Sequence, residues 1–315
     1  MELQTVVKLE RPAFQVDYTT PVMMLGSCFV ENMGEKLKYF RFPVDINPCG
    51  IVYNPFSVAE TIYFLLHRKQ FRADELWQNA GKWVSLSHHG CFSDRDVEEC
   101  LRKINCRMEN SSLFLRKTKV MVITWGTSWV YKHKSSGRIV VNCHKFPAGD
   151  FDHYRLGVSD VVSLYVNLLQ ELFAEMPELE VVFTVSPVRH WKDGAHGNQV
   201  SKAVLLLAID ELVRRFAQVS YFPSFEIVMD ELRDYRFYAE DMLHLSAQGI
   251  HYIWERFRET YMTEQARDMM KQVDKLNKIL LHRPLDAKDE ASGLQKKEAI
   301  AALQQLGFSV EFPGI

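Results

Sequence analysis

A serine and a cysteine stand side by side at the end of an apolar stretch near the start of the chain. Residues 22–25 form a strand-like run that ends at Gly26, and a helix-like stretch follows at 31–40. A strand that turns directly into a helix presents a side chain at the sheet edge, beside free backbone N–H groups. Many α/β enzymes hold a nucleophile at such a turn. Ser27 and Cys28 are therefore both candidate nucleophiles.

An aspartate and a histidine lie three residues apart near the end of the regular part of the sequence. In the motif Asp-Met-Leu-His they are Asp241 and His244. At this spacing the carboxylate can accept a hydrogen bond from one ring nitrogen and leave the other nitrogen free as a base. The chain order nucleophile, aspartate, histidine occurs in known catalytic triads. Taken alone, the motif is also compatible with a surface turn that caps the next helix.

Other residue types suit substrate binding. Arg189 and His190 follow a strand-like run, and a guanidinium binds a carboxylate or phosphate well, although it also ties down helix ends and surface acids. His144 likewise could bind a substrate or could make a structural contact. Trp129 either packs on the sheet or stacks on a substrate. The histidines and cysteines within 88–106 do not have the spacing of a zinc finger, so no metal or other cofactor is expected.

The elements that must position these residues alternate between strand-like and helix-like stretches. Such alternation is typical of a mostly parallel sheet with helices on both faces, which binds ligands beyond the carboxyl ends of its strands. Ser159 and Ser246 are expected to cap two of the helices. Further strands are predicted within 119–126, 179–190 and 219–232, and helices at 56–68, 94–108, 158–176, 199–218 and 246–261.

The sequence divides into an α/β domain, 1–261, and a C-terminal helical appendage, 262–315, which contains a break at His-Arg-Pro (282–284). Residues 69–93 fit neither the strand nor the helix pattern and are interpreted as an insertion near the mouth of the site. The appendage could cover the sheet, mediate oligomerisation or close over the site.

Composition narrows the class of protein. The chain has 315 residues, 47% hydrophobic and 25% charged, with a formal charge of −2. No basic stripe indicates a nucleic-acid partner, and no apolar run approaches the roughly 18 residues of a membrane span. The acidic start lacks an apolar signal core, and the six cysteines are expected to be reduced thiols, so a cytoplasmic location is expected.

Several short motifs together resemble those of the GSCFA family, which is part of the SGNH (GDSL-like) hydrolase superfamily. The resemblance covers about residues 20–260 and also touches 282–284. The chain departs from the family pattern at Val30, where alanine is usual, and at Leu245, where proline is usual. The motifs are GSCFV (26–30), NPCGIVYNP (47–55), WGTSWVY (125–131), VNCHKFP (141–147), TVSPVRHWKDG (184–194), SKA (201–203) and DMLHLS (241–246).

The resemblance implies a three-layer α/β/α sandwich, SGNH- or flavodoxin-like, and an oxyanion site. In that superfamily the oxyanion is held by the nucleophile's own N–H, a glycine N–H and an asparagine side chain, and Gly50 fits the second role. The usual G-x-N-D turn is replaced by a turn that begins at Gly126 and contains no asparagine. The N–H or hydroxyl of Thr127, or the amide of Asn142, could replace it.

The GSC motif (26–28) can be aligned with the G-D-S motif of the superfamily in two registers. If GSC is aligned with G-D-S by its glycine, Cys28 is the nucleophile. If serine is aligned with serine, Ser27 is. The first register keeps the spacing from the strand and is favoured. A thiol at a helix N-terminus beside an imidazole is expected to have a lowered pKa. The alternative to a catalytic role is a structural one, in which Ser27 caps the helix and Cys28 is a small buried hydrophobic residue.

The resemblance implies a hydrolase that acts on ester bonds, with a small acyl group such as acetyl on a carbohydrate or related metabolite as the substrate. The alternatives are an acyltransferase that uses the same site and a non-catalytic binding module on the same scaffold. Neither nucleic acid nor membrane is an expected partner. The residues expected to contact the substrate are Gly126, Trp129, His144, Arg189 and His190.

Overall fold

A five-stranded parallel sheet forms the centre of the protein, described here by a computed structural model for residues 5–282 and 290–309. The strand order is β10-β9-β5-β1-β2, and every neighbouring pair is parallel. The long apolar runs form the middle strands because both of their faces are buried. The strands are β1 (Val22–Gly26), β2 (Val44–Ile46), β5 (Val120–Trp125), β9 (Glu180–Val185) and β10 (Val219–Tyr221).

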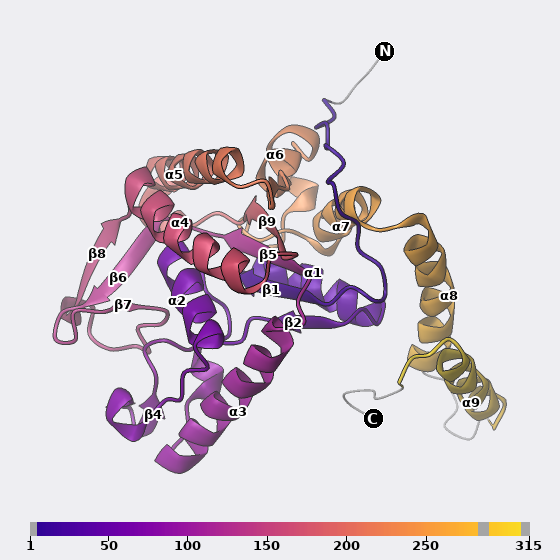
Figure 1. Ribbon diagram of the computed structural model, residues 1–315, viewed down its shortest axis with the longest axis horizontal. Helices are drawn as coiled ribbons and strands as arrows, with labels where there is room; N and C mark the ends of the chain where they lie inside the picture. Colours follow the sequence, from indigo (N-terminus) through magenta and orange to yellow (C-terminus); the bar gives the residue numbers. More distant parts are fainter. Residues whose placement is uncertain (1–4, 283–289, 310–315) are drawn as a thin grey trace.

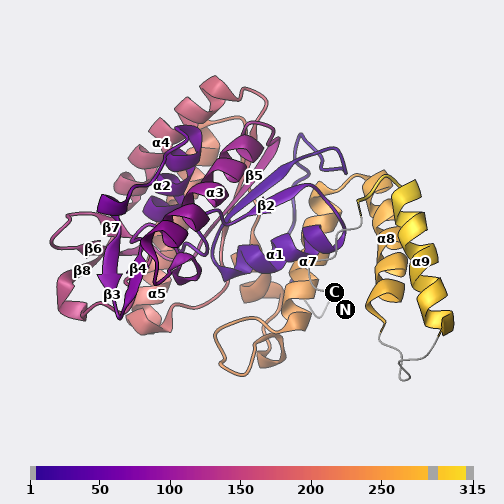
Figure 2. The ribbon, with the colours of Figure 1, turned by 90° about the horizontal axis from the view of Figure 1, so that it is seen from below.

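Helices cover both faces of this sheet, as the figures show (Figures 1 and 2). On β1, Met23 and Leu25 pack under α2 (Pro55–Leu66), α3 (Val97–Leu115), α4 (Val158–Glu175) and α5 (Gly194–Arg215). The alternate residues Val22 and Met24 pack under α1 (Cys28–Tyr39) and α7 (Ala247–Tyr261). This alternation follows from the two-residue period of a strand. The three-layer α/β/α prediction is therefore confirmed.

A small antiparallel sheet extends beyond the carboxyl end of β5. Its order is β7-β6-β8, and the sequence pattern did not predict it. The predicted insertion at 69–93 contains a separate hairpin of β3 (Trp77–Asn79) and β4 (Lys82–Val84). The three strands of the small sheet are β6 (Trp129–His133), β7 (Ile139–Val140) and β8 (Phe151–Arg155).

The C-terminal helices α8 (Glu264–Leu281) and α9 (Glu290–Gln305) pack against each other. Tyr39 fixes α8 to α1, because its hydroxyl donates to Asp274 Oδ1 at 2.9 Å and its carbonyl accepts from Asn277 Nδ2 at 2.6 Å. The pair lies at the opposite end of the molecule from β6–β8 (Figures 1 and 2). In the predicted break, His282 is described and 283–284 lie outside the described residues.

Two predicted caps had different outcomes. Ser246 caps α7 by accepting from Gly249 N, as predicted. Ser159 is not the cap of α4, because that helix begins after Gly157, whose N–H donates to Asp160. A short helix, α6 (Ser224–Glu226), follows β10. Within the described residues no helix combines the length and the apolarity needed to cross a membrane.

Candidate active site

A cavity of about 430 Å³ lies at the carboxyl edge of the parallel sheet. Its lining comes from the loops that follow β1, β5 and β9 and from the loop before α7, which are far apart in the sequence. The predicted insertion also contributes one residue, His89, to this lining. Of the predicted site residues, the cavity brings together Ser27, Cys28, Thr127, Trp129, Asn142, Arg189, His190 and His244.

The two candidate nucleophiles differ in their surroundings. Ser27 is 0% exposed, and its hydroxyl accepts a hydrogen bond from Phe29 N as the N-cap of α1. Cys28 is the first residue of that helix and is half-buried at the cavity wall. The serine hydroxyl is thus engaged in holding the helix start, whereas the thiol has no side-chain hydrogen-bond partner among the described residues.

The charge state of Cys28 differs from the sequence expectation. Burial raises the pKa of the thiol, and the carboxylate of Glu31 in the first turn of α1 raises it further. The N–H groups at the helix start and the ammonium of Lys202 lower it, but by less. The expectation of a lowered thiol pKa was wrong, because burial outweighs the helix terminus. Cys28 therefore rests as a neutral thiol and needs a base to become a nucleophile.

Asp241 and His244 form the expected pair. Oδ2 of Asp241 lies 2.6 Å from Nδ1 of His244. This hydrogen bond, together with those from the N–H groups of His244 and Leu243, lowers the pKa of the Asp241 carboxyl to about 2. The pairing assigns the proton to Nδ1 and leaves Nε2 as the basic nitrogen. His244 also lines the cavity, so this base belongs to the same site as Cys28.

Two of the predicted oxyanion donors are engaged elsewhere. The N–H of Gly50 donates to the carbonyl of Asn47 at 2.8 Å, and Gly50 does not line the cavity. The N–H of Thr127 donates to the carbonyl of Tyr53 at 3.1 Å, and its hydroxyl lies 3.0 Å from Ser201 Oγ. The structure thus contradicts both as resting donors, because each group already has a protein partner.

Two asparagine side chains at the cavity remain as donors. Asn142 accepts from His144 N through Oδ1 at 2.8 Å, and Asn54 accepts from Ser57 N through Oδ1 at 2.8 Å as the N-cap of α2. Each bond fixes the amide and leaves its Nδ2 with no acceptor among the described residues. No role for Asn54 is predicted from the sequence, although its place before Pro55 marks a helix start. Both residues line the cavity.

Comparison with known proteins decides the family. The model of the GSCFA family matches residues 21–257. The chain belongs to the GSCFA family. No curated protein sequence matched it.

Similar solved structures include a Streptococcus pneumonia protein provisionally described as a platelet activating factor, with 13% identity and a TM-score of 0.40 over 76% of this chain and 83% of that chain. A family 3 carbohydrate esterase from Clostridium thermocellum has 11% identity and a TM-score of 0.37 over 80% of this chain and 97% of that one. A family 3 carbohydrate esterase from Talaromyces cellulolyticus has 10% identity and a TM-score of 0.37, with coverages of 81% and 99%.

The other predicted substrate contacts divide into two groups in this GSCFA-family chain. His144 does not line the cavity, because its Nε2 lies 2.8 Å from the carbonyl of Ser85 and 3.1 Å from that of His88. The structure therefore does not bring this predicted substrate contact to the cavity. Arg189 does line the cavity, and its guanidinium lies over the ring of Tyr238 at 5.5 Å. No ion pair holds Arg189 within the described part of the chain.

Gly126 has a packing role instead of a substrate contact. A Cβ at this position would lie 2.9 Å from His190 Nε2 and 3.3 Å from the carbonyl oxygen of Tyr53. The absent side chain therefore makes room for the His190 ring, which lines the cavity. Burial, together with nearby Lys202 and His244, lowers the pKa of His190 to about 3. His190 is thus a neutral imidazole at the site.

Trp129 takes part in a stack that covers its ring. His153 lies between Trp129 and Tyr131, with ring centroids 4.7 Å and 4.2 Å away. Arg155 lies over the Trp129 ring at 5.8 Å. Lys192 donates to the Tyr131 hydroxyl at 2.7 Å. All three rings line the cavity, and their stacking favours the structural interpretation of Trp129.

Two motifs whose function the sequence left open hold the site together. In the NPCG motif, Asn47 accepts from Gly26 N through Oδ1 at 2.8 Å and so fixes the end of β1 below the candidate nucleophile. In the SKA motif, Ser201 Oγ accepts from Ser128 N at 2.7 Å. The next residue, Lys202, donates to two backbone carbonyls at the ends of β5 and β9. The residues in each pair are far apart in the sequence, so the local sequence pattern does not predict these contacts.

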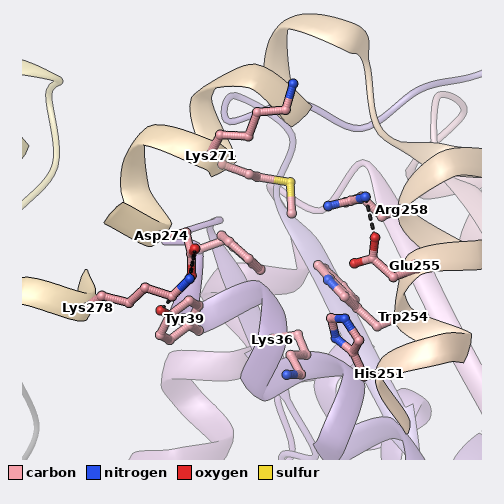
Figure 3. A pocket seen from close by; sticks show the side chains of 11 residues that line it. Lys36, Tyr39, His251, Trp254, Glu255, Arg258, Lys271, Asp274 and Lys278 are labelled. Atoms are coloured by element: carbon pink, nitrogen blue, oxygen red, sulfur yellow. Dashed lines mark hydrogen bonds and ion pairs between the residues drawn. The ribbon is translucent and has the colours of Figure 1, made fainter. Parts of the chain in front are cut away.

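A second cavity, of about 340 Å³, lies between α1, α7 and α8 (Figure 3). Glu255 pairs there with Arg258, and Asp274 pairs with Lys278 at 2.6 Å. Its lining contains neither serine nor cysteine, and Trp254 is a buried part of its wall. The predicted pair of serine and cysteine and the predicted Asp241–His244 pair lie outside this lining.

Proposed function

We propose that this protein is an ester hydrolase in which Cys28 is the nucleophile, His244 the general base and Asp241 the residue that orients it. One observation carries the proposal. A thiol that follows the first strand and an imidazole that precedes α7 line the same cavity, and the imidazole is paired with a carboxylate through Nδ1. This is the arrangement that nucleophilic catalysis at a carbonyl requires.

In the first half of the reaction, His244 Nε2 takes the thiol proton and the Cys28 sulfur attacks the ester carbonyl carbon. The tetrahedral oxyanion collapses, the carbon–oxygen bond to the alcohol breaks, and the leaving oxygen takes the proton from His244. In the second half, His244 takes a proton from water, whose oxygen attacks the thioester. Collapse releases the acid and returns the proton to the thiolate.

The oxyanion would be held by donors that the resting protein leaves unpaired. The N–H of Cys28 has no backbone acceptor among the described residues, and the amide nitrogens of Asn54 and Asn142 have no acceptor there. Each of these amides is held by its own Oδ1 hydrogen bond, which is the preorganisation that oxyanion stabilisation needs. Asn54 is the stronger candidate because it caps a helix and is buried, with 7% exposure.

The cavity suits a small acyl group on a hydroxyl-bearing molecule. Its volume of about 430 Å³ is in the lower range of ligand pockets. Polar groups that can bind hydroxyls line the cavity, among them Asn142, Lys192 and Asp193, and the neutral imidazole of His190 lines it as well. We therefore propose acetyl esters of carbohydrates or related metabolites as the first substrates to test.

The experiment measures acetate release from p-nitrophenyl acetate and from acetylated xylose. The compared proteins are the wild type and the variants Cys28→Ala, Ser27→Ala and His244→Ala. The proposal expects Cys28→Ala and His244→Ala to lose activity, with melting temperatures close to that of the wild type. Ser27→Ala should keep activity and lose about 1 kcal/mol of stability, because it removes a helix cap.

Other outcomes would overturn the proposal in distinct ways. Activity that survives in Cys28→Ala and is lost in Ser27→Ala, with fluorophosphonate labelling of Ser27, would assign a serine nucleophile. Acetyl transfer from acetyl-CoA to the sugar with little hydrolysis would assign an acyltransferase. Saturable sugar binding that is unchanged in both variants, with no turnover, would assign a binding module.

A further inference from the structure

Arg189 lines two cavities at once. One is the active-site cavity, which Cys28 and His244 also line. The other, here called the tyrosine cavity, has a volume of about 210 Å³ and includes Tyr235 and Tyr238 in its lining. Arg189 is half-buried, and no hydrogen bond or ion pair engages its guanidinium among the described residues. Because a guanidinium always carries a charge and offers five N–H donors, it is a binding group that the protein itself does not use.

Two contacts set the position of Arg189. The backbone N–H of the next residue, His190, donates to Asn198 Oδ1 at 3.0 Å, which ties the loop after β9 to α5. The guanidinium carbon lies 5.5 Å from the centroid of the Tyr238 ring. Such a cation–π contact holds the charged group on the ring and uses none of its N–H donors as hydrogen bonds, so they remain available for an oxyanion.

The tyrosine under Arg189 belongs to the loop that carries the candidate base. Tyr238 forms a β-bridge with Leu245, and the N–H of Ala239 donates to the carbonyl of His244 at 2.8 Å. In the proposed reaction His244 gives its proton to the leaving oxygen, so the alcohol part of the ester must lie beside this loop. Arg189 packs on the same loop. A group that binds to it therefore belongs to the alcohol part and not to the acyl part.

The other charged groups of the active-site cavity do not offset this cation. Lys192 is a second cation in the lining, and its Nζ donates to the Tyr131 hydroxyl at 2.7 Å. Asp193 is the one carboxylate in that lining among the described residues. Its side chain is 8% exposed, and its Oδ1 lies 3.7 Å from His153 Nε2. The lining thus contains two cations and a single, largely buried carboxylate, which favours an anionic ligand.

In the tyrosine cavity the other charged side chains already have partners. Arg233 pairs with Asp230 at 2.9 Å, and Asp234 pairs with Arg236 at 2.8 Å. Within the described part of the chain, Arg189 is the one charged residue in this lining that has no ion pair. An anion that binds to Arg189 therefore displaces no carboxylate of the protein.

We propose that Arg189 is a specificity-determining residue whose guanidinium binds a carboxylate or a phosphate on the alcohol part of the ester. A guanidinium binds such a group through two parallel, charge-assisted hydrogen bonds. The preferred substrates are then acetyl esters of acidic sugars, and esters of neutral sugars are poorer substrates. The tyrosine cavity provides room for the rest of the sugar. This inference rests on the proposed ester hydrolysis and narrows its substrate class.

The experiment measures acetate release from two matched pairs of substrates. Acetylated glucuronic acid is compared with its methyl ester, and acetylated glucose 6-phosphate with acetylated glucose. In the wild type, kcat/KM should be about tenfold or more higher for the anionic member of a pair, as expected for hydrogen bonds to a charged group. In Arg189→Met the ratio should fall to about one, since no cation remains to bind the anion. A preference in the first pair assigns a carboxylate, and one in the second assigns a phosphate.

The matched control is Arg233→Met, because Arg233 is an exposed arginine of the tyrosine cavity that already pairs with Asp230. This variant should keep the ratio of the wild type. A merely structural role for Arg189 predicts that Arg189→Met lowers kcat/KM equally for both members of a pair. A ratio that is unchanged in Arg189→Met, or a ratio of about one in the wild type, would overturn the inference and leave the proposed hydrolysis standing.

A second variant and a binding measurement cover the remaining cases. If Arg189→Met does not fold, Arg189→Lys is used; it keeps the charge but loses the planar fork, so its ratio should lie between one and that of the wild type. If the wild type releases no acetate from any ester, the proposed hydrolysis fails and calorimetry tests the anion site alone. Glucuronic acid should then bind about tenfold more tightly than its methyl ester to the wild type. Equal binding of the two, or binding of neither, would overturn the inference.

Discussion

The carboxylate of Asp241 makes three hydrogen bonds, two with His244 and one with Leu243. Oδ2 lies 2.6 Å from the ring Nδ1, and Oδ1 accepts from the backbone N–H groups of Leu243 and His244, both at 2.9 Å. The pair is nevertheless exposed, with 53% of the histidine side chain accessible to solvent. Its order therefore comes from local hydrogen bonds and not from burial, which makes it testable by small substitutions.

Asp241→Asn is expected to lower kcat for ester hydrolysis by about 10³-fold, because the amide no longer selects the tautomer with a basic Nε2. The melting temperature at neutral pH should change little, since the pair is exposed. The lowered Asp241 pKa stabilises the fold above the ordinary carboxyl range, and this contribution disappears as the pH falls through about 2. Asp234→Asn is the matched control, because Asp234 caps a neighbouring turn through Arg236 N and has no histidine partner. Equal losses of activity in both variants would contradict the prediction.

Asn54→Ser is expected to separate the two roles of Asn54. Serine still caps α2, so the free energy of unfolding should change by less than about 0.5 kcal/mol. It lacks the amide donor, so kcat should fall by about 10²–10³-fold with a small change in KM. Steady-state kinetics and urea unfolding measure the two effects. The comparison variant is Asn142→Ser, and a larger loss of kcat there would assign the oxyanion role to Asn142.

The parts of the site that could be predicted from the sequence are local. The turn at Ser27 and Cys28 follows from one strand and the helix after it, and the Asp241–His244 pair spans four residues. The availability of a donor could not be predicted. The N–H groups of Gly126 and Thr127 donate to the carbonyl of Tyr53, about 70 residues earlier, and nothing in the local sequence indicates this.

Charge states were harder to predict than positions. The helix start beside Cys28 favours a low thiol pKa, but burial depends on the packing of the whole cavity wall and decides the direction. The small sheet escaped prediction for a related reason. Trp129 pairs with Arg155 across a long connection, and the register of such a pair is not set by the residues next to either strand.

Gly26→Ala is expected to cost about 3 kcal/mol or more of the free energy of unfolding, because the added Cβ has no room. Gly26 has φ +140°, and a Cβ there would lie 2.1 Å from the carbonyl oxygen of Thr124 on β5. Gly137→Ala is the control, because Gly137 has φ +67° and open space around it, so its cost should be about 1 kcal/mol. Urea unfolding measures both variants, and equal costs would argue against the close approach of β1 and β5.

The stability of the protein is expected to decrease in mild acid because two histidines, the buried His88 and the half-buried His190, stay neutral in the folded state. Burial lowers the pKa of His88 and of His190 to about 3 each. The unfolded chain takes up protons below the ordinary histidine pKa of about 6.5. Stability is therefore retained above that pH and falls as the pH drops towards 3. His88 has the clearer cause, since its Nδ1 lies 2.8 Å from Ser85 Oγ and its Nε2 has no partner among the described residues.

His88→Phe tests this explanation, because phenylalanine suits the aromatic contacts that His88 makes with Phe71 and Phe92 and cannot titrate. Urea midpoints are measured at about pH 7 and about pH 4.5 for the wild type, His88→Phe and His196→Gln, where His196 is exposed. The wild type and His196→Gln should lose the same stability between the two pH values, and His88→Phe should lose less. If His88→Phe loses as much as the wild type, the acid sensitivity arises elsewhere. In the expected case, His88→Phe still loses some stability between the two pH values. The double variant with His190→Gln should lose less again, because the two histidines titrate independently in the unfolded chain.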